Sequence, residues 1–343
     1  MTEKLISLHL NANQPDLFEQ FVESLIIYTN NIKILEILVH IDAGDQDMKK
    51  SISKYDKYDG LIQYFETNLI KNFSHAWKPL NILLQKTSPS VKLISCVSDE
   101  LRIITHSWDE KLLNIYRENG NSILRIRCSK NKNYIYDDIW QCGYAPDAYS
   151  FYSKKWMTVI GMWCPCIGPD TFQECISFYL KKQIKNKNLE LVSNDIDLQG
   201  ESVSEGMNLS KRLQRTRIYY KAFFKLMSYD MQKNALNSSK RIISEIKKID
   251  PNLSIDEYNL SYMKINYTNF CRRFNYFKHR GSPNHPINNI LKNIVFLIWC
   301  YSYIFDKILE NFLKYLYKKN LLKLLFKDSS QYKHLEKILE IEK

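Results

Sequence analysis

The sequence predicts an α/β protein, with a mostly parallel sheet flanked by helices over residues 1–205 and an all-helical region over residues 206–343. The near-continuous apolar run from Ile34 to Ile41 has the length and composition of a strand buried on both faces, as in parallel sheets. Strand-like runs alternate with segments of helical periodicity up to about residue 205. Beyond Gly206 only helical patterns follow, which sets the boundary between the two predicted domains.

The first elements form one βαβ unit. Residues 5–10 read as a strand, and the turn that follows offers Asn13 as a helix N-cap with Pro15 near the first helical turn. Apolar residues recur at helical spacing over 17–29, and the buried strand 34–41 ends in the acidic loop Asp42–Asp47. This order predicts a helix crossing between two parallel strands, with carboxylates at the end of the second strand.

The remaining elements of the first domain continue the alternation. They are a strand at 61–65, a helix at 73–84, a strand at 91–97, a helix opened by Ser107 in a capping box with Glu110, a strand at 122–127, a polar and aromatic loop at 131–150, and helices at 153–160 and, opened by Asp170, to about 182. The loop's Trp140, Tyr144 and Asp147 suit either sugar stacking or packing in the core or a lid.

Composition narrows the class of protein. The chain has 343 residues and a formal net charge of +12, and the basic excess lies in residues 206–343. A basic region of this kind favours an anionic partner such as a membrane surface or nucleic acid. No secretory signal opens the sequence, and its 8 cysteines are dispersed, several within apolar runs. We therefore expect free thiols and a cytoplasmic protein.

The chemistry concentrates where the strand at 91–97 ends. Asp99 and Glu100 follow it directly, and in open α/β sheets ligands bind at the carboxyl ends of strands. Paired carboxylates there can hold a divalent cation against a diphosphate, because Mg²⁺ prefers oxygen ligands. The alternative is that the doublet only solvates a turn. No phosphate-binding glycine loop, nucleophile elbow or zinc-spaced cysteine set is present.

The order of these signals resembles a family-2-like glycosyltransferase of the GT-A fold over about residues 4–205. Asn11-Ala-Asn-Gln-Pro is similar to the family's opening loop, Ile41-Asp-Ala-Gly-Asp to its acidic loop, and Ser98-Asp99-Glu100 stands at its DxD-type motif. Thr105-His-Ser-Trp-Asp-Glu-Lys-Leu-Leu is similar to the segment that follows that motif in some members. Gly168-Pro-Asp-Thr-Phe falls where inverting members carry a catalytic base at a helix start.

The resemblance implies an enzyme that moves a sugar from a UDP- or GDP-sugar to a hydroxyl of a glycan or lipid-linked acceptor, inverting the anomeric centre. The implied residues are Asn11, Asn13, Asp42, Asp45, Asn81 and Asp99 for the donor nucleotide, Asp99 and Glu100 for Mg²⁺ or Mn²⁺, and Asp170 as the base. Asp99-Glu100 departs from a true DxD. No histidine stands at the expected late position, where Asp195 or Asp197 is the substitute.

The basic region leaves several alternatives open. Its Lys- and aromatic-rich helices, such as 311–326, suit either peripheral contact with an anionic membrane on its cytoplasmic face or packing on the core or on a second copy in a homo-oligomer. The apolar stretch 294–305 is too short to span a bilayer. Two rival functions remain: a nucleotidyltransferase-like α/β enzyme, or a non-enzymatic protein that binds an anionic surface or nucleic acid.

Overall fold

The computed structural model describes residues 3–68, 75–120, 122–129, 132–136, 139, 142, 146–166, 168–185, 189–200, 225–261 and 315. By its contacts the chain divides into two compact units, Met1–Cys271 and Arg272–Lys343. The apolar stretch 294–305 and the predicted helix at 311–326 lie outside the described residues, apart from the single position Tyr315.

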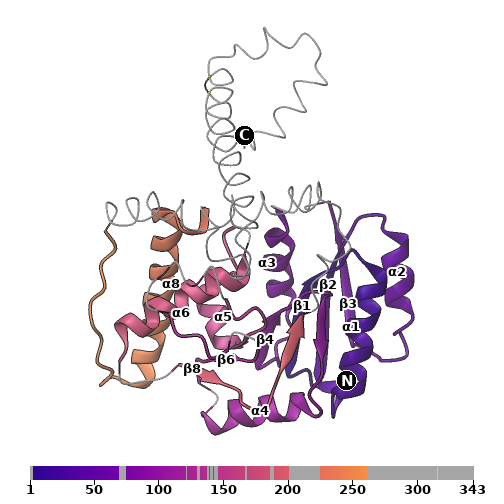
Figure 1. Cartoon of the computed structure of the whole chain (residues 1–343), viewed down its shortest axis with the longest axis horizontal. Helices are drawn as coiled ribbons and strands as arrows, with labels where there is room; N and C mark the ends of the chain where they lie inside the picture. The colour runs from indigo at the N-terminus through magenta and orange to yellow at the C-terminus, as the bar shows by residue number, and fades with distance from the viewer. Residues whose placement is uncertain are drawn as a thin grey trace, which may run out of the picture. The chain divides into compact units, whose positions relative to one another are not determined.

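A seven-stranded sheet in the order β3-β2-β1-β4-β7-β6-β8 forms the centre of this unit (Figure 1). β1, β2, β3 and β4 run parallel, β7 is antiparallel to both of its neighbours, and β8 is parallel to β6. The strands are β1 Ile6–Asn11, β2 Leu35–Asp42, β3 Ile62–Thr67, β4 Leu93–Cys96, β6 Arg125–Arg127, β7 Phe151–Ser153 and β8 Glu190–Val192. β5 (Leu101–Ile103) and β9 (Leu198–Gly200) form a separate antiparallel pair.

Helices flank the sheet, and the apolar faces of both layers form one core. The helices are α1 Pro15–Tyr28, α2 Gln46–Ser53, α3 Trp77–Lys86, α4 Trp108–Glu118, α5 Lys154–Ile160, α6 Pro169–Gln183 and α8 Tyr229–Ile249, with a short 3₁₀ turn η1 at Ile32–Ile34. β2 is buried along its length except for its last residue, as its apolar run predicts. The α/β class with a mostly parallel sheet is confirmed.

The predicted starts of α1 and α4 differ in the structure. Gln14, not Asn13, is the N-cap of α1, and Asn13 is exposed in the turn before it. The capping box at Ser107 is wrong: Ser107 has a φ of 53°, and its side chain bonds no backbone amide of α4. Glu110 does not reach back either, because its carboxylate accepts from Asn30 Nδ2 at 3.4 Å. Local spacing suggests a box, but contacts with distant Asn30 determine the geometry.

Later helix limits also shift. Gly168 is the N-cap of α6, and Pro169 its first residue, so Asp170 stands in the first turn and does not cap the helix. α3 begins at Trp77, with 73 and 74 outside the described residues. α8 is one helix, Tyr229–Ile249, whose buried residues recur at helical spacing, within the region predicted to be helical. It packs against α6 and α5, and the division at residue 205 stays a prediction.

The described cysteines agree with the expected free thiols. None of them is in a disulfide, and all except Cys96 are buried. Among the described residues, no helix has the length and apolarity that crossing a membrane requires.

Candidate functional site

The carboxyl edge of the parallel strands gathers the first group of predicted residues. Asn11 ends β1, and its Nδ2 donates to the carbonyl of Ala76 at 2.6 Å, while its buried Oδ1 has no partner. β4 pairs with β1 in parallel, with His9 opposite Cys96, and Val97 N donates to His9 O at 2.9 Å. The chain that leaves β4 toward Asp99 therefore lies beside the end of β1.

Asp99 is a buried carboxylate at this edge of the sheet. It is 7% exposed, and its Oδ2 has no hydrogen-bond partner. Burial and the adjacent charge of Glu100 raise its pKa to about 6, although the backbone N–H of Asn13 donates to its carboxylate and Arg102 lies near. A buried carboxylate with an unused oxygen beside a second carboxylate is suited to a cation that neutralises both.

Asp170 faces the same region from α6. Its charge contributes, after burial, to the raised pKa of the Cys96 thiol and of the Tyr149 phenol. Glu100 adds to the raised pKa of the same phenol, which reaches about 12. Tyr149 OH lies 3.1 Å from Ser98 Oγ. Tyr149 is therefore near both Glu100 of the acidic doublet and Asp170.

Sequence reasoning missed Tyr149. The aromatic loop was considered for sugar stacking through Trp140 and Tyr144, which lie outside the described residues, and through Asp147. Asp147 is fully buried and accepts hydrogen bonds from Ser129 N, at 2.9 Å, and from the hydroxyls of Ser129 and Ser150. The one available signal was position: Tyr149 directly precedes Ser150 and strand β7, which pairs with β4.

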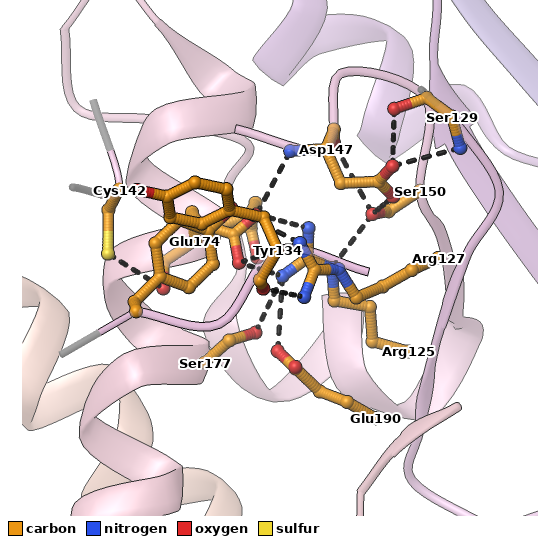
Figure 2. Close-up of polar contacts among 12 residues, drawn as sticks. Arg125, Arg127, Ser129, Tyr134, Cys142, Asp147, Ser150, Glu174, Ser177 and Glu190 are labelled. Carbon is orange, nitrogen blue, oxygen red and sulfur yellow. Dashed lines mark hydrogen bonds and ion pairs between the residues drawn. The ribbon is translucent and has the colours of Figure 1, made fainter. Parts of the chain in front are cut away.

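A buried ionic network holds this corner of the fold (Figure 2). Arg125 of β6 binds both carboxylate oxygens of Glu174 on α6, at 2.8 and 2.6 Å, and also binds Glu190 of β8 at 3.1 Å. Arg125 Nε donates to Ser150 Oγ at 2.8 Å, and Asp147 N donates to Glu174 at 3.1 Å. The network therefore joins α6, which carries Asp170, to the loop that carries Tyr149.

The other predicted residues have different surroundings. Asp42 is exposed at the end of β2, on the far side of β1 from β4. Asp45 is the N-cap of α2, where its carboxylate accepts from Met48 N at 2.9 Å. Asn81 of α3 accepts from Trp163 N at 2.7 Å and donates to Cys164 O at 2.9 Å, so its amide holds the loop before α6.

Of the substitutes for a late metal ligand, Asp197 is engaged elsewhere, because it forms an ion pair with Lys132. The structure thus brings Asn13 and Asp99 together directly, with Asn11 at the adjoining end of β1. It relates Glu100 and Asp170 to them through Tyr149 and Ser98. Asp42 lies on the next strand end, while Asp45 and Asn81 make local contacts that stabilise a helix start and a loop.

No protein-family model matches the sequence, and no curated protein matches it either. Among solved structures, the chain aligns with PcManGT, a mannosyltransferase from Pyrobaculum calidifontis in complex with GDP-Man and Mn²⁺. The TM-score is 0.50 and the identity 11%, over 89% of this chain and 88% of that chain. The mostly parallel strand order of the sheet and this structural alignment point to the same fold. The chain has the GT-A glycosyltransferase fold.

A second similarity is weaker. TarS from S. aureus, residues 1–349 in complex with UDP-GlcNAc, aligns with a TM-score of 0.47 and 14% identity, over 85% of this chain and 79% of that chain. In the alignment with the longer TarS structure, this chain covers 44% of the length of TarS. The GT-A fold explains why the acidic doublet, Asn11 and Asp42 end up at one edge of the sheet, since each follows a parallel strand.

Proposed function

We propose that the chain is a glycosyltransferase that moves a sugar from a nucleotide-diphosphate donor to a hydroxyl acceptor with inversion. The observation that carries the proposal is the buried, partnerless Oδ2 of Asp99 beside Glu100, in the region that Asp170 faces from α6. The GT-A fold, and the presence of GDP-Man and Mn²⁺ in the mannosyltransferase structure, support it. UDP- and GDP-sugars are the donors that we expect.

The residues present fit a hard divalent cation. Asp99 and Glu100 would hold Mg²⁺ or Mn²⁺, which supplies positive charge against the leaving diphosphate. In the described part of the chain, no three His, Cys, Asp or Glu side chains gather as a metal site. Diphosphate oxygens and water would therefore supply the other ligands, as is usual for Mg²⁺.

The protein's own groups have distinct roles in this proposal. Asp170 accepts the proton of the acceptor hydroxyl as its oxygen bonds to the anomeric carbon, while the bond from that carbon to the diphosphate breaks and the electron pair leaves with the diphosphate. Asn11 and Asp42 bind the donor nucleotide, with the exposed backbone around Asn13 beside them. Tyr149, whose hydroxyl lies 3.1 Å from Ser98 Oγ, stands close enough to Glu100 and Asp170 to feel both charges. Asp45 and Asn81 support the site through α2 and the loop before α6.

Donor binding is the first test. We expect one nucleoside diphosphate sugar, from a panel including UDP-glucose, UDP-GlcNAc and GDP-mannose, to raise the melting temperature only when Mn²⁺ is present. Asp99→Ala should abolish this shift, because it removes the buried carboxylate. Glu118→Ala, which changes an exposed carboxylate of α4, is the matched control and should keep it.

The same screen separates the rival functions. A melting shift with nucleoside triphosphates alone would favour a nucleotidyltransferase-like enzyme, and a shift with oligonucleotides alone would favour a binding protein. A shift with a nucleotide sugar that Asp99→Ala retains would refute the role of Asp99. Turnover is then measured as release of nucleoside diphosphate, and Asp170→Asn should lower it by about 10²- to 10⁴-fold, the usual contribution of a general base.

A further inference from the structure

The turn before Asp170 is closed by a residue from much later in the chain. Gly168 has a φ of +98° and is the N-cap of α6. A Cβ on Gly168 would lie 2.8 Å from Leu226 Cδ1, closer than real contacts allow. Leu226 is itself 3% exposed. Leu226 therefore occupies the space that a side chain at position 168 would need, directly against the N-cap of α6.

Leu226 is held in place by α6 and α8 together. Its carbonyl accepts from Gln232 Nε2 at 2.7 Å, and Tyr179 OH of α6 donates to Gln232 Oε1 at 2.8 Å. Gln232 is 1% exposed, so these bonds lie in a low-dielectric interior, where an unmade partner is costly. Figure 1 shows α8 in orange beside α6 in pink. Leu226 therefore packs against the N-cap of α6, and Gln232 links its carbonyl to Tyr179 farther along the same helix.

Asp170 is the second residue of α6, two positions after Gly168. A shift of this first turn would move its carboxylate relative to Tyr149 and Cys96. The groups that we assign to the donor, Asn11 and Asp99, belong to the sheet edge and not to α6. A change at Leu226 therefore acts on the proton-accepting group while leaving the donor residues in place.

We propose that Leu226 is a positioning residue for Asp170, so that the segment 225–232 completes the active site of the sugar transfer. This inference rests on the proposed function. It concerns the segment at the start of α8, which lies beyond residues 4–205.

The test compares the same truncation, leucine to alanine, at Leu226 and at Leu236 ten residues later. Leu226→Ala should lower kcat by about 10- to 100-fold, the effect expected of a small misplacement of a catalytic group, with the Kd of the nucleotide sugar unchanged. Leu236→Ala removes the same atoms from a residue of α8 that is 5% exposed, and should leave kcat unchanged. Leu226→Met keeps the side-chain volume and should restore most of kcat. Circular dichroism verifies that each variant is folded.

A double-mutant cycle then shows whether Leu226 acts through Asp170. In an Asp170→Asn background, Leu226→Ala should cause no further loss of kcat. Equal losses in Leu226→Ala and Leu236→Ala, or a full further loss in the Asp170→Asn background, would overturn the proposal. If Leu226→Ala does not fold, Leu226→Met and Leu226→Val take its place, and identical kcat values in both and in the wild type would overturn it.

Failure of the proposed function gives different results. If no nucleotide sugar is turned over, or if Asp170→Asn keeps full turnover, the assignment of Asp170 is wrong and the role of Leu226 is refuted with it. If turnover depends on Asp170 but Leu226→Ala and the wild type have the same kcat, only the positioning role is refuted.

Discussion

His9 is an uncharged histidine in the middle of β1. Its side chain is fully buried, and burial lowers its pKa to about 3. Trp163 Nε1 donates to Nδ1 at 3.0 Å, so Nδ1 is the acceptor and Nε2 carries the proton toward the hydroxyls of Ser7 and Thr87. The ring therefore joins β1, the end of α3 and the loop before α6 without a charge.

This environment makes stability dependent on pH. The unfolded chain binds a proton at His9 below a pKa of about 6.5, whereas the folded chain does not until about pH 3. Stability should therefore fall as the pH drops from 6.5 to 3, by up to about 1.4 kcal/mol per pH unit from this group. Urea unfolding at pH 7, 6, 5 and 4 measures the slope. His9→Gln should be less stable at pH 7 but show a smaller slope, and an equal slope would contradict this origin.

Asp99 gives the opposite dependence. Its folded pKa of about 6 lies above its ordinary value of 3.8, so its contribution is present at low pH and is lost as the pH rises through 6. Asp99→Asn cannot ionise. In EDTA it should be more stable than the wild type at pH 8, by no more than about 3 kcal/mol, with no gain at pH 4. Urea unfolding at both pH values tests this, and a destabilised variant at pH 8 would refute it.

At this scale the sequence predicts the residue types and not their partners. The position of Asp99 after a buried strand was enough to predict a carboxylate at the sheet edge. The role of Asn81 was not predictable, because its amide is occupied by the backbone of Trp163 and Cys164, far along the chain. Tyr149 was not predictable for the same reason, because its neighbours Ser98, Glu100 and Asp170 lie in other parts of the chain.

At the scale of elements, the start of α6 depends on Gly168. Gly168→Ala should lower the free energy of unfolding by more than the cost of about 1–3 kcal/mol that a positive φ imposes on a non-glycine residue, because its Cβ would also contact Leu226. Gly120→Ala is the control, since Gly120 has a φ of +69° with open space around a Cβ. In a Leu226→Ala background the excess loss of Gly168→Ala should shrink. An unchanged excess would show that the contact is unimportant.

The ionic network joins α6 to β6 and β8, and its stability depends on complete pairing. Glu174→Gln should destabilise the fold by about 3–5 kcal/mol, because the fully buried Arg125 guanidinium would keep its charge without its bidentate partner. Chemical unfolding measures the loss, with Glu118→Gln on the surface of α4 as the control, expected within about 0.5 kcal/mol. A loss below about 1 kcal/mol would mean that Glu190 alone compensates Arg125.

The long elements were predictable and the short ones were not. β1, β2 and α1 have clear apolar periodicity and appear within a residue or two of their predicted limits. β7, β8 and β9 have three residues each, which is too few for a recognisable hydrophobic pattern. They form because their backbones pair with strands that lie far away in the sequence. The capping box failed similarly, because Asp109 accepts from the backbone of Asn30 and Asn31, beyond the end of α1.

At the scale of the whole molecule, the formal net charge of +12 remains to be explained. If the basic tail contacts anionic membranes, the full chain should sediment with vesicles containing phosphatidylserine and not with neutral phosphatidylcholine vesicles. Raising the salt from 0.05 to about 0.5 M should release it, because surface charges are screened within a Debye length. Equal sedimentation with both kinds of vesicle would remove the membrane from the proposed function.

The strand order has a consequence for synthesis of the chain. β4 pairs with β1 on one side, but its other edge pairs with β7, which is made only after α4 and β6. While the ribosome is still translating that interval, the nascent chain exposes an apolar strand edge with open backbone donors and acceptors, which favours misassociation with other chains. Slow codons or cold growth in this interval should therefore reduce the yield of soluble protein more than the same delay placed after Ser153.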